Sequence, residues 1–148
     1  MKSLDANILV YAHNTACAEH AAAFAVLTDL VSIPSGWVLA DQTLFEFYRC
    51  IRNPLILARP LSAPDAAARL QTLRGLPGCR ICQHAEAHWP AAIARLEAPD
   101  FPYRRTFDAV LVATLLANGV RTFYTHNSKD FVGCGIEKVV DPITGEQG

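Results

Sequence analysis

The chain has 148 residues, 51% of them hydrophobic and 18% charged, with a net charge of −1 and an isoelectric point near 6.5. The length and the apolar content favour one domain over residues 1–148 with a single hydrophobic core, and they exclude a disordered chain. The near-neutral charge argues against a strongly basic nucleic-acid binder, unless positive charge is local or clustered acidic ligands offset it.

Short apolar segments alternate with helical segments along the chain, which predicts an α/β fold built on a parallel sheet. The expected extended segments are residues 2–4, 37–39, 79–82, 120–125 and 138–140. The expected helices cover residues 7–11, 17–31, 41–52, 62–73, 86–96 and 106–118. Proline and glycine mark several of the breaks between them. Residues 126–130 are expected to form a loop.

The segment TFDAVLVATLLAN, residues 106–118, is the strongest helix prediction. It is apolar nearly all round, which is typical of a helix buried at the centre of a domain. Asn118 and Gly119 mark its end. The one acidic residue of this helix, Asp108, lies in its first turn. A carboxylate in so apolar a segment is unusual and therefore needs a structural or functional explanation.

Four acidic residues lie at element junctions or inside apolar helices: Asp5, Glu46, Asp108 and Asp130. Ligands of open parallel sheets gather beyond the carboxyl ends of the strands, where Asp5 and the segment THNSKD both lie. Carboxylates that converge in apolar surroundings repel one another and need a cation. Oxygen ligands without histidine or cysteine favour Mg²⁺ or Mn²⁺. The pattern therefore predicts a metal site suited to hydrolysis of a phosphodiester.

Three of these acidic residues also have a simpler explanation. Asp5 is placed to cap the helix that follows it, and Asp108 is placed to interact with the positive end of its own helix. Glu46 is explained equally well as a partly exposed helix residue. Spacing alone leaves these alternatives open.

The ordered motifs resemble those of a known family. LDANILVYA resembles the opening of PIN-domain ribonucleases, and LFEFYRCIRNP, FDAVLVATLLANGV and FYTHNSKDF follow in the family's order. The resemblance covers nearly the whole chain and is greatest to the VapC-type toxins of toxin–antitoxin pairs. It implies a three-layer α/β/α sandwich with a small, mostly parallel sheet. It also implies an endoribonuclease that uses Mg²⁺ or Mn²⁺ to hydrolyse RNA phosphodiester bonds as the toxin of a type II system, a cognate antitoxin and a homodimer.

The resemblance also assigns roles to residues. Asp5 and Asp108 match the family's metal-binding aspartates, and Glu46 matches the acidic residue that completes the site, where it would orient water or bind a second ion. Asp130 matches the aspartate of the terminal Asp-Phe, whereas Asn127 matches a position that is often Asp or Asn. Whether Asn127 or Asp130 is the fourth member therefore stays open. Asn7 and Thr125 match auxiliary positions that shape the site.

Two other functions remain to be weighed. A phosphatase with an N-terminal aspartate nucleophile usually has a second aspartate two residues later, and this chain has Asn7 there. A PIN-like module that binds RNA or a partner without catalysis is disfavoured because all four acidic residues are present.

The expected compartment follows from the cysteines and the N-terminus. No segment reaches the roughly 18 uncharged apolar residues of a membrane span, and Asp5 interrupts what would be the apolar core of a signal peptide. The five cysteines are an odd number in a chain too long to need disulfides, which indicates reduced thiols. We therefore expect a cytoplasmic protein with no membrane association.

Overall fold

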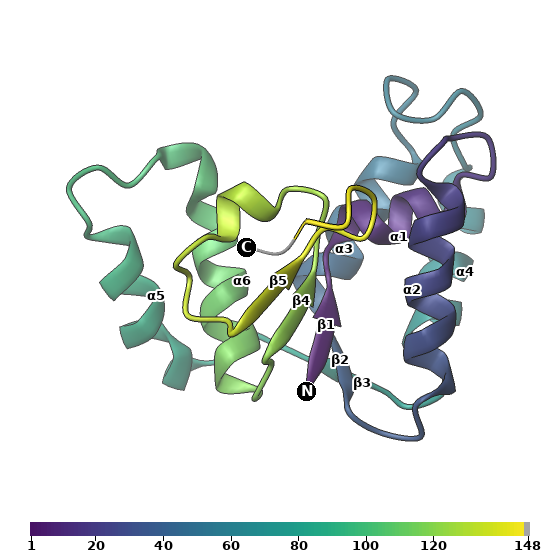
Figure 1. Cartoon of the computed structure of the whole chain (residues 1–148). Coiled ribbons are helices and arrows are strands. Elements are labelled where there is room, and N and C mark those ends of the chain that lie inside the picture. Colours follow the sequence, from purple (N-terminus) through teal and green to yellow (C-terminus); the bar gives the residue numbers. More distant parts are fainter. Residues whose placement is uncertain (147–148) are drawn as a thin grey trace.

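The computed structural model describes residues 1–146 and shows one five-stranded sheet (Figure 1). Its strands are β1 (Lys2–Leu4), β2 (Trp37–Ala40), β3 (Cys79–Cys82), β4 (Thr122–Tyr124) and β5 (Lys138–Val140). Their order across the sheet is β3-β2-β1-β4-β5, so the first strand lies at the centre and β5 at an edge, as predicted. All four pairings are parallel, so the described sheet is wholly parallel where we expected it to be mostly so.

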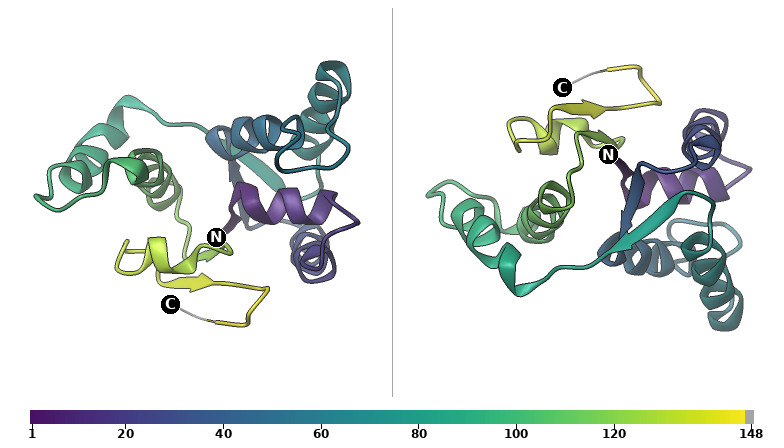
Figure 2. Two further views of the ribbon diagram at one scale, coloured as in Figure 1. Left: turned by 90° about the horizontal axis from the view of Figure 1, so that it is seen from above. Right: turned by 90° about the horizontal axis from the view of Figure 1, so that it is seen from below.

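Six α-helices of the described chain surround this sheet. They are α1 (Ala6–His13), α2 (His20–Ser32), α3 (Asp41–Ile51), α4 (Ala63–Arg74), α5 (Trp89–Leu96) and α6 (Thr106–Ala117). Figure 2 shows α1 to α4 on one side of the sheet and α5 and α6 on the other. The three-layer α/β/α sandwich is therefore confirmed.

The alternation of side chains along β2 explains why the sheet needs helices on both faces. Trp37 and Leu39 belong to the core under α1 to α4, whereas Val38 and Ala40 belong to the core under α6. All four side chains are buried. Successive residues of a strand point to opposite faces, so an uninterrupted apolar strand must be covered twice.

Helix α6 confirms the strongest prediction. Ala109, Leu111, Val112, Ala113 and Leu115 are buried against the sheet. The helix ends at Ala117 and is followed by Gly119 with a φ of 74°, a conformation that glycine adopts without steric cost.

Several predicted boundaries were wrong, among them the strand expected over 120–125, which covers Thr122–Tyr124, and three of the differences have local reasons. The helix expected from residue 17 begins at His20, because the preceding residues form turns in which the Cys17 N–H donates to the Asn14 carbonyl. The helix expected over 86–96 is divided into a 3-10 helix, Glu86–His88, and α5, whose first turn contains Pro90. The loop expected over 126–130 contains the 3-10 helix Ser128–Phe131. No helix within residues 1–146 has both the length and the apolar character needed to cross a membrane.

Candidate active site

Asp5 follows β1 directly and is held by the sheet although this strand is only three residues long. The Asp5 N–H donates to the Tyr124 carbonyl at 2.9 Å, so the β1–β4 ladder continues one residue past the strand. The residue is also the N-cap of α1, and its Oδ1 accepts from the Ala6 N–H at 2.7 Å. The cap that explained Asp5 most simply is therefore present, and it holds the carboxylate, 8% exposed, at the carboxyl edge of the sheet.

Asn7 and Thr125 join Asp5 in a hydrogen-bond network between two strand ends. Asp5 Oδ2 accepts from Thr125 Oγ1 at 2.7 Å and from Asn7 Nδ2 at 2.9 Å. Asn7 Oδ1 accepts from the His126 N–H, and Thr125 Oγ1 accepts from the Asn127 N–H at 3.0 Å. Since Thr125 is fully buried, this network orients Asp5 and ties the loop after β4 to α1. The two auxiliary residues thus lie where residues that shape a site belong.

The carboxylates come together in a cavity of about 300 Å³ at this edge of the sheet. Four of its lining residues come from separate elements of the fold. They are Asp5, which follows β1, Glu46 from α3, Asp108 from α6 and Asn127 from the loop after β4. The remaining lining residues are Ala6, Asn7, Val10, Tyr11, Arg49, Cys50 and Ile56. The acidic residues that sequence reasoning selected therefore share one cavity, apart from Asp130.

Burial and mutual repulsion perturb these carboxylates. Burial raises the pKa of Asp5 to about 6, and the charge of Glu46 adds to the rise, against hydrogen bonds that lower it. Burial followed by the charge of Asp5 raises the pKa of Asp108 to about 6, although Arg105 opposes the rise. Burial also raises the pKa of Glu46, as does Asp108, while Arg49 lowers it. Carboxyl groups that raise one another's pKa lie where a cation would be stabilised.

The donor set fits a hard divalent cation. The cavity offers carboxylate oxygens from Asp5, Glu46 and Asp108 and the amide oxygen of Asn127, which are the ligand types that Mg²⁺ and Mn²⁺ prefer. Among residues 1–146, no three histidine, cysteine, aspartate or glutamate side chains are already gathered into a metal site. The protein thus supplies suitable ligands around one cavity without a ready-made cage.

The structure separates the two candidates for the fourth site residue. Both side chains are exposed, but Asn127 lines the cavity, whereas Asp130, in the 3-10 helix Ser128–Phe131, does not. Asp130 still acts at a distance, because its charge contributes to the raised pKa of Asp108. The geometry favours Asn127 as the nearer group, and the catalytic role of either residue stays a prediction.

Sequence reasoning missed Asp141, which follows β5 much as Asp5 follows β1. Its Oδ2 lies 2.9 Å from His126 Nδ1, and its Oδ1 accepts from the Ile143 N–H at 2.8 Å. Burial alone would raise the pKa of Asp141, but these partners together hold it below its ordinary value. An acidic residue at a strand end was the sequence feature that could have identified Asp141. Its side chain stabilises a turn, however, and does not line the cavity that contains Asp5.

No protein-family model matches the chain. It is 37% identical over 149 aligned residues to ribonuclease VapC24 of Mycobacterium tuberculosis, covering 99% of each chain. It is 30% identical over 118 residues to ribonuclease VapC43 of the same species, covering 80% of each.

Solved structures share the fold at low sequence identity. Mycobacterium tuberculosis VapC20, described as a sarcin-ricin loop cleaving toxin, superposes with a TM-score of 0.69 at 18% identity, over 92% of this chain and 96% of that one. FitAcB from Neisseria gonorrhoeae superposes with a TM-score of 0.69 at 20% identity, over 96% and 98%. With a curated relative that matches along nearly its full length, the chain belongs to the VapC family of PIN-domain ribonucleases.

Proposed function

We propose that this chain is a Mg²⁺- or Mn²⁺-dependent endoribonuclease that acts as the toxin of a type II toxin–antitoxin pair. One observation carries the proposal: Asp5, Glu46 and Asp108, from three separate elements, line one cavity at the carboxyl edge of the sheet. The ribonuclease names of its relatives support the RNA substrate, and the oxygen-rich lining supports the metal.

In this proposal Asp5 and Asp108 hold the cation. When bound, it supplies positive charge to a phosphate and favours ionisation of water. Asp5 is suited to anchoring because both of its oxygens are oriented by hydrogen bonds. Burial raises the pKa of Glu46, which suits its Oε atoms to accept a proton from attacking water. Arg49, which lines the same cavity, is placed to neutralise the phosphate.

The structure gives less support to a phosphatase. That chemistry wants an acid two residues after the nucleophile, and this position is Asn7, whose Nδ2 donates to Asp5 Oδ2. An amide used in this way holds the carboxylate still and cannot transfer a proton to a leaving group.

We also propose the partners. Solved neighbours include a toxin–antitoxin complex from Klebsiella pneumoniae, which supports an antitoxin for this chain. A homodimer is implied by the family. Phe45 and Phe107, 66% and 68% exposed, support such an interface beside the site, since large exposed apolar side chains that lie together mark interaction surfaces. Light scattering of the purified chain, alone and with the product of an adjacent small antitoxin gene, tests both partners.

The decisive experiment is RNA cleavage at increasing Mg²⁺ or Mn²⁺ by the wild type and by Asp5→Asn. We expect metal-dependent cleavage by the wild type and none above background by the variant. Asp29→Asn is the matched control, because Asp29 is an exposed carboxylate on α2 that does not line the cavity. Equal activity of the wild type and Asp5→Asn would overturn the proposal.

A further inference from the structure

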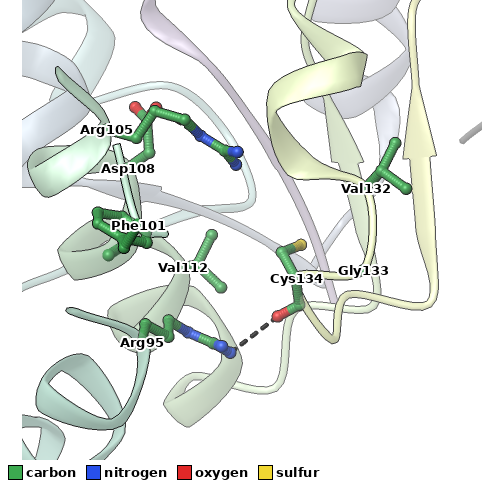
Figure 3. A pocket seen from close by; sticks show the side chains of 9 residues that line it. Arg95, Phe101, Arg105, Asp108, Val112, Val132, Gly133 and Cys134 are labelled. Carbon is green, nitrogen blue, oxygen red and sulfur yellow. Dashed lines mark hydrogen bonds and ion pairs between the residues drawn. The ribbon is translucent and has the colours of Figure 1, made fainter. Parts of the chain in front are cut away.

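A second cavity adjoins the one that contains Asp5. It has a volume of about 190 Å³ and lies between α5, α6 and the loop after the 3-10 helix Ser128–Phe131 (Figure 3). It is lined by Arg95, Phe101, Arg105, Asp108, Ala109, Val112, Val132, Gly133 and Cys134. Asp108 lines both cavities, so whatever occupies the second lies beside the candidate active site.

Two guanidinium groups of this cavity have unused hydrogen-bond donors. Arg95 Nη2 donates to the Cys134 carbonyl at 2.8 Å, but Arg95 Nε is buried without a partner. Arg105 Nε is also buried without a partner, since the nearest oxygen of Asp108 is 3.8 Å away, beyond hydrogen-bond range. Buried donors without acceptors are rare and costly in folded proteins. An acceptor-bearing ligand that drew these guanidinium groups toward it would satisfy such donors.

The remaining walls are mostly apolar. Figure 3 shows Phe101 and Val112 between the two arginine side chains, which extend toward the loop of Val132 and Cys134. The Phe101 and Val112 side chains offer a phosphate no hydrogen bonds. Mostly apolar walls with a few donors are instead typical of pockets for small organic groups, among them the nucleobases. The cavity thus favours a nucleobase over a phosphate.

We propose that this cavity receives one unpaired base of the RNA, next to the phosphate that is cleaved, and that Arg95 and Arg105 recognise acceptors on its edge. The inference rests on the proposed function. Unstacked RNA bases are commonly held on aromatic or guanidinium planes while their edges are read by hydrogen bonds. A guanine edge, with O6 and N7 side by side, offers the acceptors that arginine donors match best.

The test is cleavage of an RNA pool randomised around the cut site, with the products sequenced. The wild type should discriminate among bases at one position next to the cut. Arg95→Ala should reduce that discrimination about tenfold, the scale of one lost base contact. Arg95→Lys should not restore it, because lysine keeps the charge but not the planar donor fork. Arg69→Ala, which removes an exposed arginine of α4, is the control.

A second variant guards against loss of folding, since Arg95 also holds the Cys134 carbonyl. Phe101→Leu keeps an apolar wall but removes the aromatic face, and it should weaken discrimination at the same position. Uniform loss of cleavage on all sequences, with a shallower salt dependence, would mean a phosphate contact and would overturn the inference. Unchanged discrimination in both variants would overturn it as well. Absence of RNA cleavage by the wild type would instead remove the proposed function.

Discussion

The strand side and the helix side of the candidate site hold their carboxylates very differently. On the strand side, the oxygens of Asp5 accept from the Ala6 N–H, Asn7 Nδ2 and Thr125 Oγ1. On the helix side, the Asp108 carboxylate forms an ion pair with Arg105 at 3.8 Å, and both side chains are about a third exposed. One carboxylate is thus fixed by the fold, and the other is free to adjust.

This difference follows from the elements that carry the two residues. Asp5 lies where a buried strand becomes a helix, so the sheet ladder and the helix cap together determine its position. Asp108 lies in the first turn of α6, where the packing of the helix places the backbone but leaves the half-buried side chain with Arg105 as its ion-pair partner. We infer an oriented anchor on one side and an adaptable ligand on the other.

We expect the substitution Asp108→Asn to cause the largest change, which is a loss of RNA cleavage activity. We expect activity to fall about a hundredfold or more, because a lost ligand removes several kcal/mol of transition-state stabilisation. The free energy of unfolding at pH 7.5 without metal should stay the same or rise, since burial and then repulsion by Asp5 already raise the pKa of this carboxyl. Cleavage rates and urea unfolding measure the two effects. A parallel loss of stability would show that Asp108 is as firmly held as Asp5.

Thr125→Val tests the strand side. The substitution removes a fully buried hydroxyl that donates to Asp5 and accepts from the Asn127 N–H. We expect a loss of about 1–3 kcal/mol in the free energy of unfolding, because buried partners are left unsatisfied. Activity should fall about 10- to 100-fold, as for other groups that orient a metal ligand.

Thr28→Val is the control for this comparison. Its hydroxyl is exposed on α2 and donates to the Phe24 carbonyl. Urea unfolding should change by less than about 0.5 kcal/mol. If Thr125→Val changed the free energy of unfolding as little as Thr28→Val does, the hydrogen-bond network would not be what holds Asp5 in place.

The pH dependence of metal-free stability depends on the sign of the pKa shift. The pKa of Asp5 rises from 3.8 to about 6 on folding, so the folded protein binds this proton more tightly than the unfolded chain. The resulting stabilisation is complete below pH 3.8 and is lost as pH rises through about 6.

Unfolding with chelator present should therefore show stability falling from about pH 4 to about pH 6, by on the order of 1–3 kcal/mol. Asp5→Asn should flatten this decline. Mg²⁺ should restore stability above pH 6, because it binds the ionised carboxylates. If the free energy of unfolding of the wild type did not change with pH, or if Mg²⁺ had no effect on it, the raised pKa of the buried Asp5 carboxyl would be contradicted.

We expect the smallest change in stability and activity from the substitution Arg105→Gln. The partly exposed ion pair with Asp108 should contribute less than about 1 kcal/mol to stability. Removal of the guanidinium also removes what lowers the pKa of Asp108, so the acid limb of the pH–kcat/KM profile should move to higher pH. An unmoved limb would mean that Asp108 does not titrate in that range during catalysis.

Much of the fold could be predicted because its signals are local. The apolar runs of β2 and α6 are long enough to identify strand and helix. Pro90 restricts where the helix over 86–96 can begin, but the predicted start at residue 86 was three residues early. The start of α2 was missed because residues with good helix propensity were taken up by turns. Local propensity loses to such hydrogen bonds, which depend on where the previous helix ends.

The site was only partly predictable. Ordered motifs identified Asp5, Glu46 and Asp108, but they did not distinguish Asn127 from Asp130, since both lie within one short segment. The 3-10 helix Ser128–Phe131 separates them, leaving Asn127 at the cavity and Asp130 away from it. Sequence periodicity does not predict so short a turn of the backbone. The positions of Asn127 and Asp130 relative to the cavity therefore could not be told apart from the sequence.

From its sequence alone this protein was identifiable as an α/β chain with acidic residues at its element junctions, because periodicity and turn residues act over a few positions. The cavity shared by the carboxylates, the hydrogen bond between Thr125 and Asp5 across 120 positions, and the neighbouring cavity with Arg95 required the folded chain. Burial, repulsion and hydrogen bonding act through space. Their effects therefore exist only after distant segments have been packed side by side.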